Sequence, residues 1–430
     1  MKMMIYINSI LFLILLINKS ILVLGFEKYV NELIKMKQGG YEKLYESDSN
    51  EKHEIIFCIK QRNREYIEKL LYDVSSPKSS SYGKHLSREA IADITSNPIA
   101  TNAVKDYLQS KNIDYISTTY GEYIKATATI ETWEDILKIK FYKYYNDDED
   151  RFIHRSNYEA EVPSELKDHV QHLFKTNEFP LPNHNKALIS KTSQSNVGTP
   201  NFPSCDGTVN IACLQEYYEI NPTINKYFSN STIRQAVYEN NQTFSMEDLE
   251  TFQKQQNVIV KPVTEVSCDG TITYGSASAT CAYTGVCENA DYCVEANLDV
   301  QYIMGIAQNI STTVLFVHGD ETWEDFILSL ADNLNPPDVV SISYGGPESL
   351  VSSKQMYTFD YEAIKLGING TSIIVSSGDD GANGQFAGIS SVFCGYNPEF
   401  PASSPWVTAV GATQFNANGD EVGITYIILP

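Results

Sequence analysis

Histidine, basic residues and long apolar runs are scarce in this sequence of 430 residues. It has 7 histidines, and 32 lysines and arginines stand against 54 aspartates and glutamates, for a formal net charge of -22. This shortage of positive charge argues against a nucleic-acid partner, because a phosphate backbone attracts Lys and Arg. Beyond the N-terminus no apolar run is long enough to cross a bilayer, so we expect no membrane span in the mature protein.

The longest apolar run lies at the N-terminus. Lys2 precedes the run Ile10–Ile17, which is followed by the polar residues Asn18–Ser20 and, after a second short apolar stretch, by Gly25. A membrane anchor is the alternative, but the run is too short to span a bilayer. A basic start, a short apolar core and a small residue predict a signal peptide over residues 1–25. We therefore expect the secretory pathway, with lysosomal and extracellular destinations both open.

The cysteines and the N-glycosylation sequons are consistent with passage through the oxidising secretory pathway. The eight cysteines form no CxxC pair, which disfavours a zinc site and favours disulfides. Cys205 and Cys213 are predicted to pair locally. The sequence leaves open the pairing of Cys268, Cys281, Cys287 and Cys293 and the partner of Cys394. Four sequons predict N-glycosylation, at Asn230, Asn241, Asn309 and Asn369.

The composition divides the chain into two regions and a linker. Residues 26–175 are poor in glycine and rich in helix-then-strand patterns. Residues 176–204 are rich in Asn, Pro, Ser and Thr, which is typical of an exposed linker that a processing protease can cut. Residues 205–430 alternate strands with helices, which implies a parallel sheet with helices on both faces.

Small or polar residues follow the predicted strands of the second region. The strands and the residues after them are Thr313–Val317 with His318–Asp320, Val339–Tyr344 with Gly345 and Gly346, and Ser372–Val375 with Ser377–Gly381; a fourth strand is predicted at Trp406–Val410. In open parallel sheets, ligands bind beyond the carboxyl ends of the strands. A binding site is therefore predicted at this edge.

Two acids on one predicted helix are the strongest candidates for chemistry. Glu295 and Asp299 lie at i and i+4 in the helical pattern Cys293–Tyr302, which places their Cβ atoms about 6 Å apart. Two carboxylates at that spacing repel each other and favour sharing one proton, as acid–base work requires. The alternative is a solvated helix face that carries two acids.

A third acid and the lack of histidine restrict the choice of mechanism. Asp379 follows Ser377 and Gly378 at a strand end, where it faces a ligand or, alternatively, only stabilises a turn. After the linker the sequence contains one histidine, His318, so a Ser-His-Asp arrangement would need it as the base. If His318 is a loop residue, a peptidase built on this chain must use carboxylates.

With these residues placed, the sequence resembles the serine-carboxyl peptidases of the sedolisin family, and most closely their tripeptidyl-peptidase branch. The resemblance rests on Glu295–Tyr302, Ser341–Gly345, Ser377–Gly381 and Phe400–Thr413, and earlier in the chain on Val74–Pro77, Tyr82–Leu86 and Val162–Leu166. It implies a subtilisin-like α/β catalytic domain over residues 205–430. It also implies an α+β activation pro-domain that acts as an intramolecular inhibitor until acid-triggered cleavage.

The resemblance also assigns roles. Glu295 would take the proton of the attacking serine, Asp299 would orient Glu295, and protonated Asp379 would donate to the developing oxyanion. An ionised Asp379 would repel the oxyanion, which explains a need for acid. Peptides or unfolded proteins are the implied substrates. The implied substrate-binding residues are Ser343, Tyr344 and Gly345.

The nucleophile departs from the family pattern. The family's serine lies in a Gly-Thr-Ser-x-x-x-Pro segment, whereas Gly370–Ser372 lacks the proline and precedes a predicted strand. We therefore expect these 430 residues to be truncated at the C-terminus, with an incomplete sheet and with the nucleophilic serine outside them. The resemblance implies calcium as a cofactor, but its C-terminal binding loop is also outside them, and no metal ligand is predicted here.

The sequence thus predicts an acid-acting serine-type peptidase that releases tripeptides from protein N-termini, with internal cleavage left open. One alternative is a non-catalytic truncated homologue that binds peptides or inhibits a full-length peptidase through its pro-domain. A product that misfolds and is degraded is another, because an unpaired Cys394 and exposed sheet edges are liabilities. A third keeps hydrolysis but uses another nucleophile within the chain.

Overall fold

The computed structural model describes two packed domains. The described residues are 38–147, 150–180, 205, 209–221, 223, 232–268, 271–274, 283–284, 293–317, 327–328, 330, 332–384, 396–415 and 421–423. The predicted signal peptide, residues 181–204, Asn230, His318, Cys281, Cys287 and Cys394 lie outside these ranges. Within them, no helix combines the length and the apolar character needed to cross a membrane.

The N-terminal domain is built on a four-stranded antiparallel sheet in the order β3-β4-β2-β7. A second, three-stranded antiparallel sheet has the order β1-β5-β6. The strands are β1 Glu42–Glu46, β2 Lys52–Ile59, β3 Asp114–Ser117, β4 Tyr123–Thr129, β5 Phe141–Asn146, β6 Arg151–Ser156 and β7 Val170–Phe174. The helices are α2 Arg64–Ser75, α3 Arg88–Thr95, α4 Pro98–Ser110, α5 Ile130–Leu137 and the short η1 Ser164–Leu166.

The C-terminal domain contains a seven-stranded sheet in the order β11-β10-β13-β8-β14-β16-β18. Six strands are parallel, and β11 is an antiparallel edge strand. These strands are β8 Arg234–Asn240, β10 Glu265–Cys268, β11 Thr271–Tyr274, β13 Ser311–Val317, β14 Val339–Ile342, β16 Ser372–Ser376 and β18 Thr408–Val410. The predicted parallel α/β sheet is therefore present.

Helices and short strand pairs complete this domain. The helices are α6 Ile211–Tyr217, α7 Met246–Gln255, α8 Val294–Ile306 and α10 Ser353–Asn369, with the short turns η4 Glu348–Leu350 and η5 Gly381–Asn383. The paired short strands are β9 Phe244–Ser245 with β12 Tyr283–Thr284, β15 Gly346–Pro347 with β17 Glu399–Phe400, and β19 Thr413–Phe415 with β20 Glu421–Gly423.

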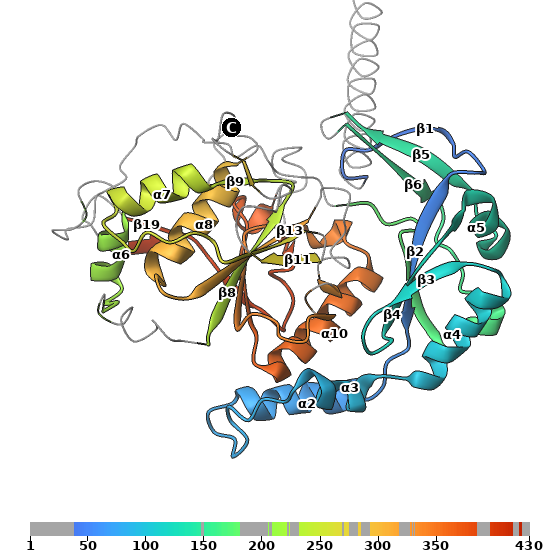
Figure 1. Cartoon of the computed structure of the whole chain (residues 1–430), viewed down its shortest axis with the longest axis horizontal. Coiled ribbons are helices and arrows are strands. Elements are labelled where there is room, and N and C mark those ends of the chain that lie inside the picture. Colours follow the sequence, from blue (N-terminus) through green and yellow to red (C-terminus); the bar gives the residue numbers. More distant parts are fainter. Residues whose placement is uncertain are drawn as a thin grey trace, which may run out of the picture.

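Alternation along β8 shows why helices cover both faces of the large sheet. Val237 packs against α8 residues such as Val300, whereas its neighbours Ala236 and Tyr238 lie in the cluster that contains Phe359 of α10. Successive side chains of a strand point to opposite faces, so an uninterrupted apolar strand needs a partner on each side. Figure 1 shows α7 and α8 on one face and α10 on the other.

Helix α10 lies between the two domains and is buried on most of its surface. Ser352 and Gln355 form a reciprocal cap at its start, and Gly370 ends it in the left-handed conformation at φ 110°. Its outer side contacts the N-terminal sheet, because Ile56 and Cys58 of β2 share a core cluster with Phe359. In Figure 1 the helix is seen between the large sheet and the blue-green N-terminal domain.

Candidate active site

Helix α8 places the two predicted acids at the carboxyl edge of the large sheet. Its first turn is held by the segment after β8, because Gln242 Oε1 accepts the backbone N–H of Glu295 at 2.9 Å and that of Ala296 at 3.4 Å. Asn297 adds a second anchor by accepting the backbone N–H of Ser245 at 2.8 Å. The Gln242 contacts satisfy N–H groups that a helix start leaves unpaired, and both anchors fix the orientation of α8.

Glu295 and Asp299 are both largely removed from water. Burial, then the charges of Asp299 and Asp379, raise the pKa of Glu295 to about 7. Burial raises the pKa of Asp299 to about 6, although the Ser343 hydroxyl donates to Asp299 Oδ1 at 2.9 Å and opposes the rise. The pair therefore does not lie on a solvated helix face, and two coupled carboxyls of this kind can hold and pass one proton.

Asp379 lies within electrostatic reach of this pair. It follows β16, its side chain is exposed, and its charge is one of the causes that raise the pKa of Glu295. The preceding Gly378 has φ 88°, a left-handed conformation that disfavours any side chain. The structure thus brings together three acids that lie up to 84 positions apart in sequence, the difference between 295 and 379.

The predicted substrate-binding residues follow β14 and adjoin the same group. Ser343 contacts Asp299, and the Tyr344 hydroxyl donates to Glu239 Oε2 at 2.9 Å. Gly345 approaches β17 so closely that a Cβ atom there would lie 2.9 Å from the carbonyl oxygen of Phe400. This close contact needs glycine and fixes the segment against β17.

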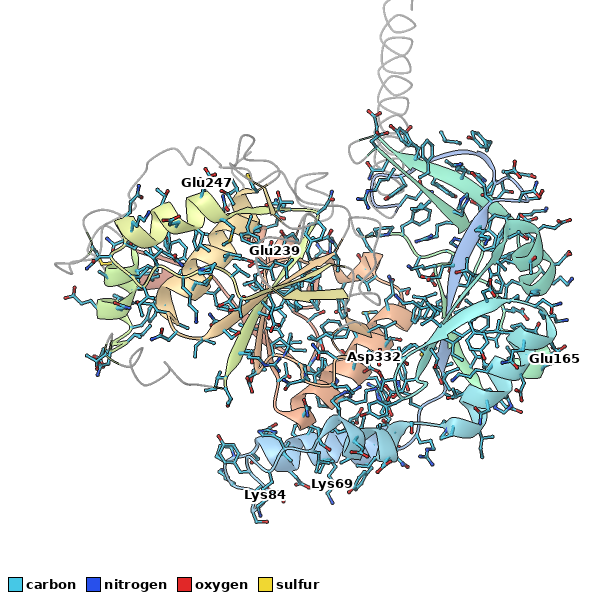
Figure 2. The ribbon with its side chains drawn as sticks, in the orientation of Figure 1. Lys69, Lys84, Glu165, Glu239, Glu247 and Asp332 are labelled. Carbon is cyan, nitrogen blue, oxygen red and sulfur yellow. A yellow bond between two sulfur atoms is a disulfide. The ribbon has the colours of Figure 1, made fainter. Side chains whose placement is uncertain are left out.

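Glu239 is a further residue of the candidate site, and no motif in the sequence predicted it. It is near the end of β8, its side chain is 0% exposed, and its Oε1 atom is buried without a hydrogen-bond partner in the described part of the chain. Burial, and then the charge of Asp299, raise its pKa well above the ordinary value of 4.5. Figure 2 marks Glu239 at the centre of this domain. The signal available in the sequence was an acid inside an apolar strand.

The predicted disulfide between Cys205 and Cys213 is present, with a Cα–Cα distance of 4.7 Å. Cys293 is also disulfide-bonded, and Cys58 is a buried free thiol. Among the residues that the structure describes, no group of three or more His, Cys, Asp or Glu side chains could hold a metal ion. The expected calcium therefore stays a prediction from the resemblance.

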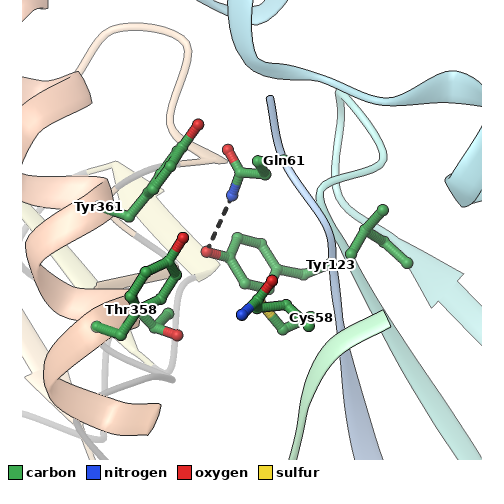
Figure 3. Close-up of a pocket in the computed structure, with 8 residues that line it drawn as sticks. Cys58, Gln61, Tyr123, Thr358 and Tyr361 are labelled. Atoms are coloured by element: carbon green, nitrogen blue, oxygen red, sulfur yellow. Dashed lines mark hydrogen bonds between the residues drawn. The ribbon is translucent and has the colours of Figure 1, made fainter. Parts of the chain in front are cut away.

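A small cavity lies away from the acids, between β2 and α10. Cys58, Gln61 and Tyr123 line it from the N-terminal domain, and Thr358 and Tyr361 line it from α10. Gln61 Nε2 donates to the Tyr123 hydroxyl at 3.3 Å, as Figure 3 shows. This cavity belongs to the contact between the domains and not to the candidate active site.

Comparison with known proteins adds the family. The model of the pro-kumamolisin activation domain matches residues 40–179. Physarolisin of Physarum polycephalum is 27% identical over 380 residues, which cover 84% of this chain and 60% of that protein. Tripeptidyl-peptidase 1 of Mus musculus is 26% identical over 385 residues, which cover 87% of this chain and 64% of that protein. These matches support a resemblance of the chain to the sedolisin family and, within it, to the tripeptidyl-peptidases.

The chain spans 60% to 64% of the length of those two curated relatives. A solved structure of Pseudomonas sedolisin, a serine-carboxyl proteinase complexed with two molecules of pseudo-iodotyrostatin, matches with a TM-score of 0.31 and 21% identity. That match covers 45% of this chain and 53% of the other. The activation-domain model matches the N-terminal domain, which we call the pro-domain, and we call the C-terminal domain the peptidase domain after the function proposed below.

The packed pro-domain extends beyond residue 175, where the sequence analysis placed the start of the linker. Thr176 and Glu178 are buried, and Lys354 at the start of α10 pairs with Glu178 at 2.5 Å. The first residues of the expected linker thus form part of the contact between the domains.

Proposed function

We propose that the protein is an acid-acting serine-type peptidase that releases tripeptides from the N-termini of peptides and unfolded proteins. The observation that carries the proposal is the coupled pair of Glu295 and Asp299, two largely buried carboxyls with raised pKa values at the carboxyl edge of the sheet. No segment of these 430 residues matches the full motif that carries the family's nucleophilic serine. Calcium is proposed as a cofactor on the family resemblance, with ligands outside the described residues.

The pair suits base catalysis in acid. When it holds one proton, the remaining negative charge can accept the proton of a serine hydroxyl as that oxygen attacks a peptide carbonyl. Asp299, held by Ser343, orients Glu295. Protonated Asp379 then donates a hydrogen bond to the oxyanion that develops, whereas an ionised Asp379 would repel it. Above neutral pH the pair loses its last proton, and the crowded negative charge opposes formation of the oxyanion.

The pro-domain supports synthesis as an inactive precursor in the secretory pathway. Contacts with α10 link it to the helix that also packs under β8, β14 and β16. We propose that it inhibits the peptidase domain until acid weakens this contact, and that the signal peptide and glycans predicted from sequence direct the protein to a lysosomal or extracellular destination.

The test is hydrolysis by the acid-treated full-length protein of a fluorogenic tripeptide amide with a free N-terminus. Turnover in acid, lost by roughly 10²–10⁴-fold in Glu295→Gln, is expected. The matched control is Glu247→Gln on the exposed surface of α7, which should retain turnover. An N-acetylated substrate tests the position of cleavage, because equal rates on both would contradict tripeptide release. Absence of acid hydrolysis would reject the function.

The non-catalytic alternative has one supporting observation, the match of the activation-domain model to residues 40–179. On that reading, the purified chain inhibits a full-length relative at acid pH and shows no hydrolysis itself. Inhibition without turnover would favour this alternative.

A further inference from the structure

Glu399 lies beside the candidate active site and has no role in the mechanism described above. It forms half of the short strand β17, where it is paired with Pro347 of β15. That pairing holds it against the segment that follows β14 and carries Ser343. The backbone is fixed further by Glu348, whose N–H donates to the Pro398 carbonyl at 2.9 Å. Glu399 therefore sits on a backbone that is tied directly to the substrate-binding segment.

The carboxylate of Glu399 packs onto the loop that carries Asp379. A Cβ atom built at Gly378 would lie 2.5 Å from Glu399 Oε2 and 2.7 Å from its Cδ. Real Cβ atoms essentially never lie this close to another heavy atom, so the carboxyl occupies the space that a side chain at 378 would need. Gly378 is thus required twice, for its left-handed φ of 88° and for contact with this carboxyl.

The surroundings of Glu399 are acidic. The charged residues that face it are Asp379 and Asp380 on the loop after β16, and Glu348 is the charged residue next to its partner strand. Its Oε1 atom is buried and accepts no hydrogen bond from the described part of the chain. Burial, then the charges of Asp380 and Asp379, raise the pKa of Glu399 to about 7. A protonated carboxyl fits this place, and an ionised one is repelled by it.

We propose that Glu399 is a positioning residue that holds the Gly378–Asp380 loop, and with it the Asp379 carboxyl, in place while Glu399 is protonated. The inference rests on the proposed function, in which Asp379 donates to the oxyanion. Ionisation of Glu399 would bring three carboxylates together around Gly378, and the loop would move away from β17. The negative charge of Asp379 raises the pKa of Glu295. The position of that charge therefore depends on whether Glu399 is protonated.

The first experiment does not depend on hydrolysis. Hydrogen exchange of the segment 376–384 is followed in the 430-residue chain and in Glu399→Gln, with Glu247→Gln as the matched control. Once corrected for intrinsic exchange, protection in the wild type and the control should fall about tenfold or more between about pH 5 and about pH 8. In Glu399→Gln it should change less than about twofold. Equal pH dependence in all three proteins would overturn the proposal.

A second variant covers the possibility that Glu399→Gln does not fold. Gly378→Ala places a methyl group where the Glu399 carboxyl lies, so the loop should be displaced at every pH. Low protection of the segment at about pH 5 with little pH dependence is the expected result. High protection with the wild-type pH dependence would overturn the inference.

The last experiment separates the positioning role from the proposed function. In the full-length protein, the alkaline limb of kcat should move upward by about one pH unit in Glu399→Gln, with KM little changed. An unmoved limb in a folded variant contradicts positioning through Glu399. If the wild type hydrolyses nothing, the proposed function fails, and the exchange result alone decides whether Glu399 controls the loop.

Discussion

The Nζ atom of Lys365, in helix α10 of the peptidase domain, lies 2.8 Å from Oε1 of Glu122 in the pro-domain, and both side chains are buried. Glu362 pairs with the same ammonium at 2.7 Å and accepts the Tyr123 hydroxyl at 2.7 Å. Arg88 adds a second cation, 3.7 Å from Glu122. The contact between the domains thus has a charged centre inside an apolar rim, and its strength depends on the charges of these groups.

Replacement of Lys365 by methionine should destabilise the precursor strongly. The variant Lys365→Met removes the cation shared by Glu122 and Glu362 and leaves buried carboxylates underpaired, which costs about 3–5 kcal/mol. Denaturant unfolding of the intact chain measures the loss. Lys254→Met is the control, because Lys254 pairs with Glu250 on an exposed helix surface, where a pair contributes about 0–1 kcal/mol. Equal losses in the two variants would show that the buried network does not stabilise the contact.

Acid should weaken the contact between the domains. Protonation of His172 should cause the part of this weakening that occurs between about pH 6.5 and about pH 4. Burial, then the charge of Lys354, lower the pKa of His172 from its ordinary 6.5 to about 4. The packed state therefore resists protonation, so the stability contributed by neutral His172 is complete above pH 6.5 and is lost as pH falls towards 4.

Glu122 should act in a lower range. Burial raises its pKa, but Lys365 and Arg88 outweigh that effect, so the pKa lies below the ordinary 4.5. Its contribution is present above pH 4.5 and is lost as pH falls below that value. Hydrogen exchange of β2 and α10 across the acid range measures both effects. Above about pH 4.5, the loss of protection on acidification should be smaller in His172→Phe than in the wild type, whereas in His169→Phe it should be as large as in the wild type. An unchanged profile in His172→Phe would contradict the role of His172.

The stability contributed by the carboxyls of the candidate active site should change with pH in the opposite direction, increasing in acid. The pKa values of Glu295, Asp299 and Glu239 are raised by burial, so the peptidase domain is most stable with these groups protonated. For Glu295, the rise from 4.5 to about 7 corresponds to about 3 kcal/mol, present below pH 4.5 and lost as pH rises through 7. Acid therefore stabilises the site while it loosens the pro-domain.

Glu239→Gln isolates this effect at one buried position. The amide cannot ionise and still offers an oxygen to the Tyr344 hydroxyl, so the variant should gain stability at about pH 8 relative to the wild type. At about pH 4 the two proteins should unfold within about 1 kcal/mol of each other. Thermal unfolding at both pH values checks this, with Glu247→Gln as the surface control. A variant that is less stable at the higher pH would contradict a protonated Glu239.

Local patterns explain which parts of this site could be predicted. Glu295 and Asp299 are one helical turn apart, and Asp379 follows an apolar strand, so helix spacing and the strand ends made all three candidates, with the solvated helix face and the turn left as alternatives. Glu239 has no such mark, because its partners Tyr344 and Asp299 are distant in sequence and adjacent only after the sheet forms. Lys365 likewise lies in a helix whose charged side would normally face water, and the pro-domain, far earlier in the chain, buries it.

The Asn369 sequon provides a last prediction about the contact between the domains. Asn369 Nδ2, the atom to which a glycan would be attached, donates to the Leu86 carbonyl of the pro-domain at 2.7 Å. The Leu86 N–H in turn donates to the Ile368 carbonyl at 3.0 Å, and the Thr371 hydroxyl of the sequon is buried against the Pro337 carbonyl. The partly buried Asn369 amide thus lies against the pro-domain, and we expect the packed pro-domain to hinder attachment of a glycan there.

We expect Asn369 to carry no glycan in the folded precursor, in contrast to the prediction from the sequon alone. The protein, expressed through the secretory pathway of a host cell, is compared with Asn369→Gln and Asn309→Gln by intact mass before and after enzymatic removal of N-glycans. The mass released should be unchanged in Asn369→Gln, and it should fall in Asn309→Gln, the comparison at a second predicted sequon. If Asn369→Gln releases less glycan than the wild type, Asn369 is modified. That result would contradict hindrance of this site by the packed pro-domain.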